Sequence, residues 1–286
     1  MEILKNFIKL FLKSLNIKLI RYGKDGIRAE CKKYLNLNYS EYDKELNGFI
    51  KNSMSQYGQD YFINILLNKK ESGYYVEFGA IDGIINSNSY FFEKFKSYNG
   101  IVCEPAVKYH KALRKNRNCK IETLCLAEES NKIYQFIETT NWPGGNTLKK
   151  YIQQGVRKRN IDKTYDVKTI SLIDMLIKHE APSYIDFISI DTEGSEYDIL
   201  KKFNFDRFKF GIILVEHAFE TEKKNKIKNL LQNNNYVEII PKFIIDHGDS
   251  WYVSKEILQN YKSLINSSVI KKKLTKNLSR CILNIY

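Results

Sequence analysis

Residues 74–83 read Tyr74-Tyr75-Val76-Glu77-Phe78-Gly79-Ala80-Ile81-Asp82-Gly83. The apolar run predicts a buried strand. The glycines that follow predict a tight turn, because glycine adopts backbone conformations that other residues disfavour. In an open α/β sheet, ligands bind at the carboxyl ends of the strands, where such turns lie. The segment therefore predicts an α/β sheet that holds a nucleoside-type ligand at this turn.

A second acid supports this interpretation. Glu104 ends the next apolar run, Ile101-Val102-Cys103, and lies 21 residues after Gly83. In dinucleotide-binding folds, a carboxylate at about this distance along the chain binds the ribose hydroxyls. Glu104 is therefore a candidate ribose-binding residue.

The turn differs from the dinucleotide-binding pattern G-x-G-x-x-G, because its glycines are spaced as Gly79-x-x-x-Gly83. Glu77 and Asp82 bring two carboxylates to it, which would repel a diphosphate and attract a cationic ligand. S-adenosylmethionine carries a sulfonium and an amino group and no phosphate, so we favour it over NAD. An ordinary turn with a glycine cap is the simpler alternative.

The rest of the chain alternates between short apolar runs and amphipathic segments. The predicted strands are 74–78, 100–103, 120–124, 185–190, 211–216, 236–240 and 250–254. The predicted helices are 55–68, 88–97, 106–117, 171–180, 195–203 and 222–234. This order is typical of a Rossmann-like, doubly wound, mostly parallel seven-stranded sheet.

Basic residues are concentrated at the two ends of the chain. The net charge is +13, and residues 1–55 contain 11 Lys/Arg against 6 Asp/Glu, while residues 255–286 contain 7 against 1. A nearly neutral centre with basic ends favours contact with an anionic surface over a groove that follows nucleic-acid phosphates. A general compositional bias is the alternative. We predict a helical extension at 1–54, a catalytic domain at 55–254 and a basic extension at 255–286.

The first twenty residues predict an amphipathic helix. Lys5, Lys9 and Lys13 recur every four residues and interrupt any apolar run, which excludes a membrane span and a secretory signal. This helix either packs on protein or lies on a membrane surface. Five cysteines form no metal-binding or disulfide pattern, so we expect a cytoplasmic protein, peripheral at the inner membrane surface if the helix binds lipid. A homo-oligomer is compatible with the sequence.

Acids also follow a later predicted strand. Residues 185–190 run into Asp191, and Glu193 comes two residues later. An unpaired buried carboxylate costs on the order of several kcal/mol, so these acids need a cation, a metal ion or a hydrogen-bonded ligand. Ser195 and Glu196 instead fit the cap and first turn of the next helix. Asp191 and Glu193 are therefore candidate functional residues.

The next predicted strand ends in Glu216 and His217. His217 could accept a proton from a substrate hydroxyl, and a structural hydrogen bond is the alternative role. Asp191 and Glu216 are candidate ligands for a divalent cation that would lower the pKa of such a hydroxyl. Residues 131–168 interrupt the strand–helix pattern and form either a substrate-contacting insertion or a plain surface loop.

Together these motifs resemble the FkbM family of class I S-adenosylmethionine-dependent methyltransferases. The resemblance spans roughly residues 55–254. Its motifs are Glu77-Phe78-Gly79-Ala80-x-x-Gly83, Asn86-Ser87-Asn88-Ser89, Glu104-Pro105, Val167 to Asp174, Asp191-x-Glu193-Gly194-x-Glu196 and Glu216-His217.

The resemblance implies a role for each matched residue. Gly79 and Gly83 would lie under the methionine part of S-adenosylmethionine, with Glu77 near its amino group. Glu104 would bind the ribose, and Asp191 would lie nearest the methyl group. The other residues implied in cofactor binding are Ala80, Asp82, Ser87 and Asn88.

Family members typically methylate hydroxyl oxygens, often on sugars of surface glycans. The expected function is therefore O-methylation of a sugar hydroxyl, with Asp191, Glu193 and His217 as catalytic residues. One alternative is a catalytically weak binding module in a glycan-assembly or membrane complex. Another is a methyltransferase for nucleic acid or a different small molecule. We do not expect nucleic acid, because the sequence contains no Asn/Asp-Pro-Pro-Tyr/Phe motif and no cysteine at the strand-end position that pyrimidine methyltransferases use for covalent attack.

Overall fold

The computed structural model describes residues 49, 51–56, 58–140, 144–152, 160–217, 220–239 and 248–266. All of them belong to one structural unit, Gly48–Tyr286. The helix predicted over residues 1–20 lies outside the described residues, as does the basic extension beyond α10 (Lys255–Asn266). In the described part of the chain, no helix is both long enough and apolar enough to cross a bilayer.

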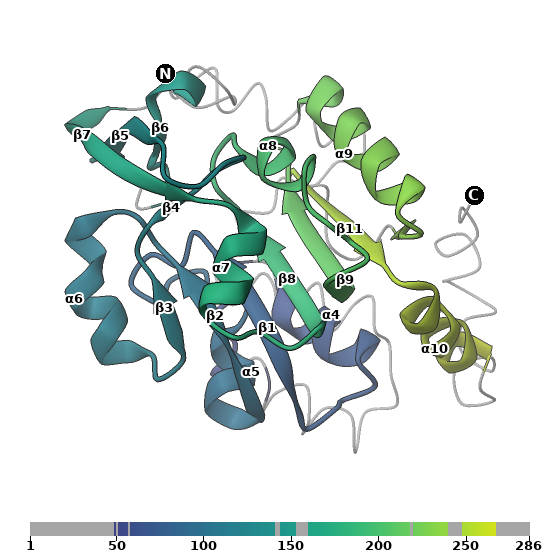
Figure 1. Cartoon of the computed structure of the whole chain (residues 1–286). Helices are drawn as coiled ribbons and strands as arrows, with labels where there is room; N and C mark the ends of the chain where they lie inside the picture. Colours follow the sequence, from purple (N-terminus) through teal and green to yellow (C-terminus); the bar gives the residue numbers. More distant parts are fainter. Residues whose placement is uncertain are drawn as a thin grey trace, which may run out of the picture. The chain divides into compact units, whose positions relative to one another are not determined.

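Seven strands form the main sheet in the order β10-β11-β9-β8-β1-β2-β3 (Figure 1). They are β1 (Ser72–Phe78), β2 (Ser97–Cys103), β3 (Lys120–Glu122), β8 (Tyr184–Ile190), β9 (Lys209–Glu216), β10 (Val237–Ile239) and β11 (Asp249–Val253). Strand β11 runs antiparallel to β9 and β10, and the other neighbours are parallel. The predicted mostly parallel α/β sheet of seven strands is confirmed.

Helices cover both faces of this sheet (Figure 1). They are α4 (Gln59–Leu66), α5 (Tyr90–Phe95), α6 (Val107–Asn116), α7 (Leu172–Lys178), α8 (Glu196–Leu200) and α9 (Thr221–Asn233). One hydrophobic cluster joins the sheet to α7, α8 and α9 through Met175, Ile199 and Ile227. Another joins it to α4 and α5 through Phe62 and Phe92. Because helices cover both faces, the central strands are buried over most of their length and are rich in apolar residues.

The strand order reverses at β1, which pairs in parallel with β2 on one side and β8 on the other. The connections from β1 and β8 therefore leave the sheet in opposite directions and open a crevice at the carboxyl ends of these strands. Ligands of open α/β sheets bind in this crevice.

A second sheet of four strands, in the order β4-β7-β5-β6, occupies the region that interrupted the sequence pattern. Its strands are β4 (Cys125–Leu126), β5 (Ile133–Thr139), β6 (Thr147–Leu148) and β7 (Ile161–Ile170), and the 3₁₀ turn η1 (Lys149–Tyr151) follows β6. None of its strands was predicted from the sequence. The first residues of β5 and β7 are solvent-exposed, so these strands show no continuous apolar run.

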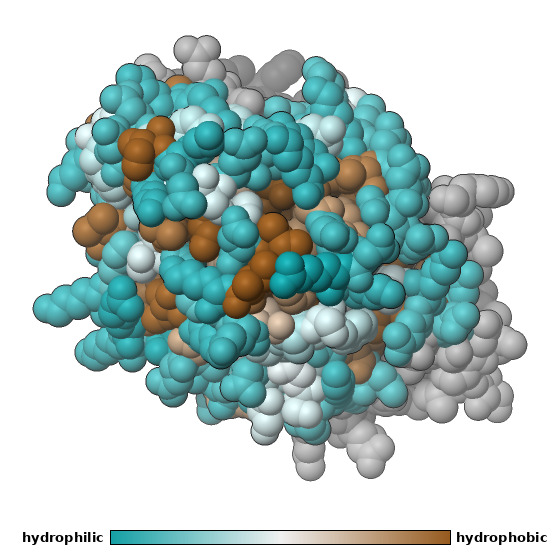
Figure 2. All heavy atoms as spheres, in the orientation of Figure 1, coloured by the Kyte–Doolittle hydropathy of each residue, from teal (hydrophilic) through white to brown (hydrophobic). Residues whose placement is uncertain are grey.

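The face of the molecule shown in Figure 2 is mostly hydrophilic, with hydrophobic residues in separate groups. Exposed large apolar side chains of the described residues include Ile177 in α7 and Ile133 in β5. Scattered apolar residues of this kind are normal on a protein surface. This face therefore does not by itself indicate a permanent protein interface.

Candidate active site

A cavity opens at the carboxyl ends of β1, β2 and β8 and encloses about 870 Å³, including the solvent at its mouth. One wall comes from the main sheet and includes Gly79, Glu104 and Asp191. Phe136 and Leu148 of the four-stranded sheet also line it. The insertion thus contributes to the cavity and is more than a plain surface loop.

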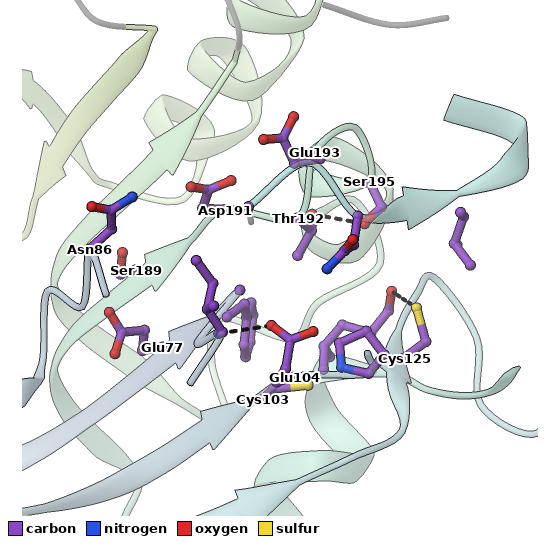
Figure 3. Close-up of a pocket in the computed structure, with 18 of the residues that line it drawn as sticks. Glu77, Asn86, Cys103, Glu104, Cys125, Ser189, Asp191, Thr192, Glu193 and Ser195 are labelled. Carbon is purple, nitrogen blue, oxygen red and sulfur yellow. Dashed lines mark hydrogen bonds between the residues drawn. The ribbon is translucent and has the colours of Figure 1, made fainter. Parts of the chain in front are cut away.

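Four carboxylates line the cavity. Glu77 and Glu104 lie on one side, and Asp191 and Glu193 lie across from them (Figure 3). None of the described lining residues is Lys, Arg or His. Such a wall repels anions and attracts cations, so it suits a sulfonium ligand better than a diphosphate.

Gly79 brings two strand ends into contact. Its φ of +74° is in the left-handed region, and a Cβ placed on it would lie 2.2 Å from the backbone oxygen of Asp191. Its N–H donates a hydrogen bond to the Cys103 oxygen at 3.1 Å. Any side chain at this position would push β1 and β8 apart at the cavity.

Gly79→Ala should reduce ligand affinity more than it reduces the stability of the rest of the fold. The left-handed φ alone costs about 1–3 kcal/mol, and the contact with Asp191 adds to it. We expect the affinity for S-adenosylhomocysteine, measured by calorimetry, to fall at least about tenfold, which is about 1.4 kcal/mol.

The matched control is Gly73→Ala at the other end of β1, where a Cβ would lie 2.3 Å from the Asp186 carboxylate. It should lower the melting temperature and leave affinity unchanged. Equal affinity losses in the two variants would contradict a specific role for Gly79.

Glu104 is buried at the end of β2, with 3% of its surface exposed. One carboxylate oxygen accepts from the Ile81 N–H and the other from the Ala106 N–H, each at 2.8 Å. Burial raises its pKa to about 7, although both of these hydrogen bonds lower it. Each carboxylate oxygen keeps a second lone pair, so a ligand in the cavity can donate further hydrogen bonds to it.

Glu77 is largely engaged within the protein. Its carboxylate accepts from Ser87 Oγ at 2.7 Å, from Ser89 Oγ at 2.6 Å and from the Asn88 N–H at 2.5 Å. It thereby fixes the segment after the glycine turn. Asn88 itself lines the cavity, and its Oδ1 is buried and has no hydrogen-bond partner among the described residues. The predicted cofactor contact of Glu77 is therefore shared with a structural role.

Four of the predicted cofactor residues do not line the cavity. Asp82 accepts hydrogen bonds from the N–H groups of Ile84 and Ile85, which closes the turn. Ala80 packs in the core, and Ser87 is bonded to Glu77. The φ of Gly83 is +85°, and a Cβ there would lie 2.6 Å from Arg117 Cγ. The second glycine therefore makes room for an arginine, whereas the resemblance implied that it lies under a ligand.

Asp191 and Glu216 form a coupled pair. Asp191 is partly exposed to solvent, and desolvation by the atoms around it raises its pKa to about 6, while a hydrogen bond with Glu216 lowers it. Burial and the charges of Asp191 and Glu193 raise the pKa of Glu216 well above its ordinary value. Two carboxyls this close share one proton. Since Glu216 is shifted further, Asp191 is the ionised member near neutral pH and is the one that faces the cavity.

Glu193 completes an acidic group. One carboxylate oxygen each from Asp191, Glu193 and Glu216 lies within 4.8 Å of the others. Glu193 has a left-handed φ of +57°, and its backbone oxygen accepts a hydrogen bond from Thr147 Oγ1 at 2.9 Å. The four-stranded sheet thus holds this loop in place. The structure brings together the predicted cation ligands Asp191 and Glu216 and adds Glu193 to them.

Glu196 has the structural role expected at the start of α8. Its carboxylate accepts from the N–H groups of Thr192 and Gly194 at 3.1 and 2.9 Å and pairs with Lys223 at 3.0 Å. Ser195 is the residue before the helix, but its side chain makes no capping hydrogen bond. Instead, Ser195 Oγ donates to Thr192 Oγ1 at 2.8 Å (Figure 3). These contacts hold the loop that carries Asp191.

His217 does not line the cavity, in contrast to its predicted place in the site. It is 2% exposed, and its backbone N–H donates to the Gly248 oxygen at 2.6 Å. Side chains alternate between the two faces of a strand, and Glu216 at the end of β9 faces the acidic group. The next residue therefore points elsewhere.

Other polar residues of the cavity wall were not among the predicted site residues, although Asn86 lies in one of the motifs that carry the family resemblance. They include Gln56, Asn86, Ser189 and Thr192. Ser189 had a detectable signal, because it is a polar residue near the carboxyl end of a largely apolar strand. Its Oγ accepts a hydrogen bond from Asn88 Nδ2 at 3.0 Å. This bond joins β8 to the segment after the glycine turn.

Known structures offer only distant likenesses. They include the methyltransferase FkbM from Methylobacillus flagellatus KT, with 13% identity, a TM-score of 0.41 and coverage of 64% of this chain and 44% of that one. Another is an O-methyltransferase from Bacillus cereus in complex with SAH, with 12% identity, a TM-score of 0.38 and coverage of 86% and 97%. At these values neither adds weight to a functional assignment. No curated protein matches the chain by sequence.

A family comparison gives a clearer result. The sequence profile described as the methyltransferase FkbM domain matches residues 77–243. This range contains the glycine turn, Glu104, the four-stranded sheet and the acidic group at Asp191. The match covers more than half of the chain, which therefore belongs to the FkbM family of methyltransferases.

Proposed function

We propose that the protein transfers a methyl group from S-adenosylmethionine to a hydroxyl of a sugar in a surface glycan or related glycoconjugate. The observation that carries this proposal is the cavity at the strand ends, in which Glu104 lies across from Asp191. Glu104 is available to bind a ribose, and Asp191 is available to interact with an acceptor hydroxyl.

The residues of the cavity fit this donor. Glu104 would accept hydrogen bonds from the ribose hydroxyls, and Asn88 Oδ1, which is buried and unpaired among the described residues, would accept from the amino group. Gly79 leaves room for close approach to the backbone. S-adenosylmethionine supplies an electrophilic methyl group when it is bound. The protein contributes alignment and removes the proton of the acceptor.

Asp191 is the proposed base. It is the ionised member of the pair with Glu216 and faces the cavity, so it can take the proton of an acceptor hydroxyl. Glu193 orients the acceptor from the same side. His217 was an alternative base, but its position outside the cavity wall disfavours it.

A divalent cation held by Asp191, Glu193 and Glu216 is a second way to activate the hydroxyl. We expect turnover to stay within about twofold in EDTA, because a shared proton already offsets the repulsion between Asp191 and Glu216. The measurement is initial rate before and after chelation. Loss of activity that Mg²⁺ or Mn²⁺ restores would establish the cation instead.

The charge of the cavity favours a neutral acceptor. The described wall carries four acids and no basic side chain, so a phosphorylated or carboxylated acceptor would be repelled. The same feature disfavours nucleic acid.

The test is transfer of a labelled methyl group to a panel of neutral glycans, uronic-acid glycans, nucleotide sugars and RNA, with mass spectrometry of the product. An O-methylated neutral sugar is the expected result. An N-methyl or C-methyl product would refute the assignment. Failure to bind S-adenosylmethionine at millimolar concentration would favour the alternative of a binding module.

We further propose a cytoplasmic protein that contacts a membrane surface or a partner protein through residues 1–20. The amphipathic pattern of Lys5, Lys9 and Lys13 supports this placement. Deletion of residues 1–20 should abolish sedimentation with anionic liposomes, and unchanged binding would refute the membrane contact. Light scattering of both forms would show whether this segment also joins copies of the chain.

A further inference from the structure

Arg117 is a buried cation that the proposed reaction does not use directly. It follows α6, and its side chain is completely shielded from solvent. Its Nε donates to Glu93 at 2.6 Å, and its Nη1 lies 3.5 Å from the Glu77 carboxylate. A buried guanidinium needs such partners, because an isolated charge in the protein interior is costly. Arg117 thus neutralises part of the negative charge beneath the cavity.

Arg117 also holds the segment that follows the glycine turn. Its Nη1 donates to the Gly83 oxygen and to Ser87 Oγ, both at 3.1 Å, and its Nη2 donates to Ser89 Oγ at 2.7 Å. These three groups span the segment on both sides of Asn88. A planar guanidinium can make this set of bonds, whereas a lysine ammonium cannot reach all of them.

The contacts of Arg117 and Glu77 converge on one residue. Glu77 accepts from the Asn88 N–H and from Ser87 and Ser89, the two serines that Arg117 also binds. Asn88 is therefore fixed on both sides, and its side chain lines the cavity. The stem of Arg117 occupies the space that a side chain on Gly83 would fill. Arg117 therefore packs against Gly83 and is hydrogen-bonded to Ser87 and Ser89.

Electrostatics agree with this arrangement. Although burial alone would raise the pKa of Glu93, the charge of Arg117 brings it down to about 2. Glu93 in turn accepts from the Tyr75 hydroxyl at 2.7 Å and the Asn118 N–H at 2.8 Å. The Arg117 guanidinium is thus paired with Glu93 of α5, which is ionised near neutral pH. Its position is set by the fold and does not depend on a ligand.

We infer that Arg117 is a positioning residue for the methyl donor, acting through Ser87, Ser89 and Glu77 to hold Asn88 in its binding position. This inference rests on the proposed donor site. It predicts that loss of the guanidinium fork weakens donor binding without changing the chemical step. Arg117 touches neither substrate, so a purely structural role is the competing explanation.

The test uses Arg117→Lys, which keeps the positive charge but removes the planar guanidinium and its several hydrogen-bond donors. We expect its affinity for S-adenosylhomocysteine to fall at least tenfold and its KM for the donor to rise in parallel. At saturating donor, kcat should stay within about twofold, since the acceptor side is untouched. Ser89→Ala removes one hydrogen bond of the Arg117 guanidinium. It should likewise raise KM for the donor and leave kcat nearly unchanged, with a smaller loss of affinity.

The matched control is Asp186→Asn. Asp186 is buried in β8 and pairs with Lys70 at 2.7 Å, but it lies at the end of the sheet remote from the cavity. It should lower the melting temperature and leave affinity unchanged. The role of Arg117 would be refuted if Arg117→Lys kept wild-type affinity, or if Arg117→Lys and Asp186→Asn lost affinity equally. Either result would leave the proposed donor site unaffected. Absence of binding in the wild-type protein would overturn the proposed donor site together with this inference.

Discussion

Asp191→Asn should lower kcat by about 10²–10⁴-fold, the usual contribution of a general base. The amide keeps the shape of the side chain but cannot accept the proton of an acceptor hydroxyl. Donor affinity should change by no more than about threefold, because the proposed cofactor contacts are made by other residues, Glu104 and Asn88. The measurements are single-turnover methyl transfer and calorimetry with S-adenosylhomocysteine.

Asp198→Asn is a matched control for this variant. Asp198 lies in the first turn of α8, outside the cavity wall, where it pairs with Lys201 and bonds to the Tyr151 hydroxyl. It should retain near-normal turnover. His217→Ala separates the two candidate bases, and its loss of turnover should be much smaller than that of Asp191→Asn. Near-normal turnover in Asp191→Asn would show that this aspartate is not the base.

Glu104→Gln should lower the affinity for S-adenosylhomocysteine by about 10–100-fold, because a hydrogen bond to a charged group contributes about 1.5–3 kcal/mol. It should also abolish a pH dependence present in the wild-type protein. Burial raises the pKa of Glu104 to about 7. The ionised carboxylate is the form that accepts from ribose hydroxyls, so wild-type affinity should be constant above pH 8 and decline as the pH falls through 7.

Glu122→Gln is the control for this prediction. Glu122 ends the neighbouring strand β3, is also buried and accepts from two backbone N–H groups, those of Thr123 and Leu124. It pairs with Lys178 and does not line the cavity. Its substitution should affect stability and leave donor affinity unchanged. An affinity of Glu104→Gln equal to that of the wild type at pH 8 would rule out the ribose contact.

The sheet was predictable because its strands are buried on both faces. Each of the seven predicted strands overlaps an observed one, and β8 illustrates why, with six consecutive buried residues. The direction of β11 was not predictable from its own residues, because it depends on how the chain returns after β10. The four-stranded sheet was missed for a related reason. Strands β5 and β7 are exposed at their start and rely on each other for hydrogen bonds.

The site was predictable where a residue acts from the end of a strand. Asp191 and Glu104 line the cavity as expected. Gly83 and Asp82 do not, because their roles depend on partners that no local pattern reveals. Arg117 lies 34 residues after Gly83 in the sequence and contacts it only in the folded protein. The role of His217 depended on which face of the chain it occupies after β9 ends, and its residue type carries no information about that.

The chain enters and leaves most of the four-stranded sheet at one place. The chain leaves the main body after Leu126 and returns at Ile170, and these two residues are partners in the pairing of β4 with β7. The Ala127 N–H donates to the Ile170 oxygen at 3.1 Å, so both ends of the intervening segment lie side by side. That segment contributes Phe136 and Leu148 to the cavity and none of the proposed donor contacts. Both ends of residues 127–170 are thus fixed at a single strand pair, so we expect substitutions of Phe136 or Leu148 to alter what else binds in the cavity while Glu104 and Asn88 keep their places.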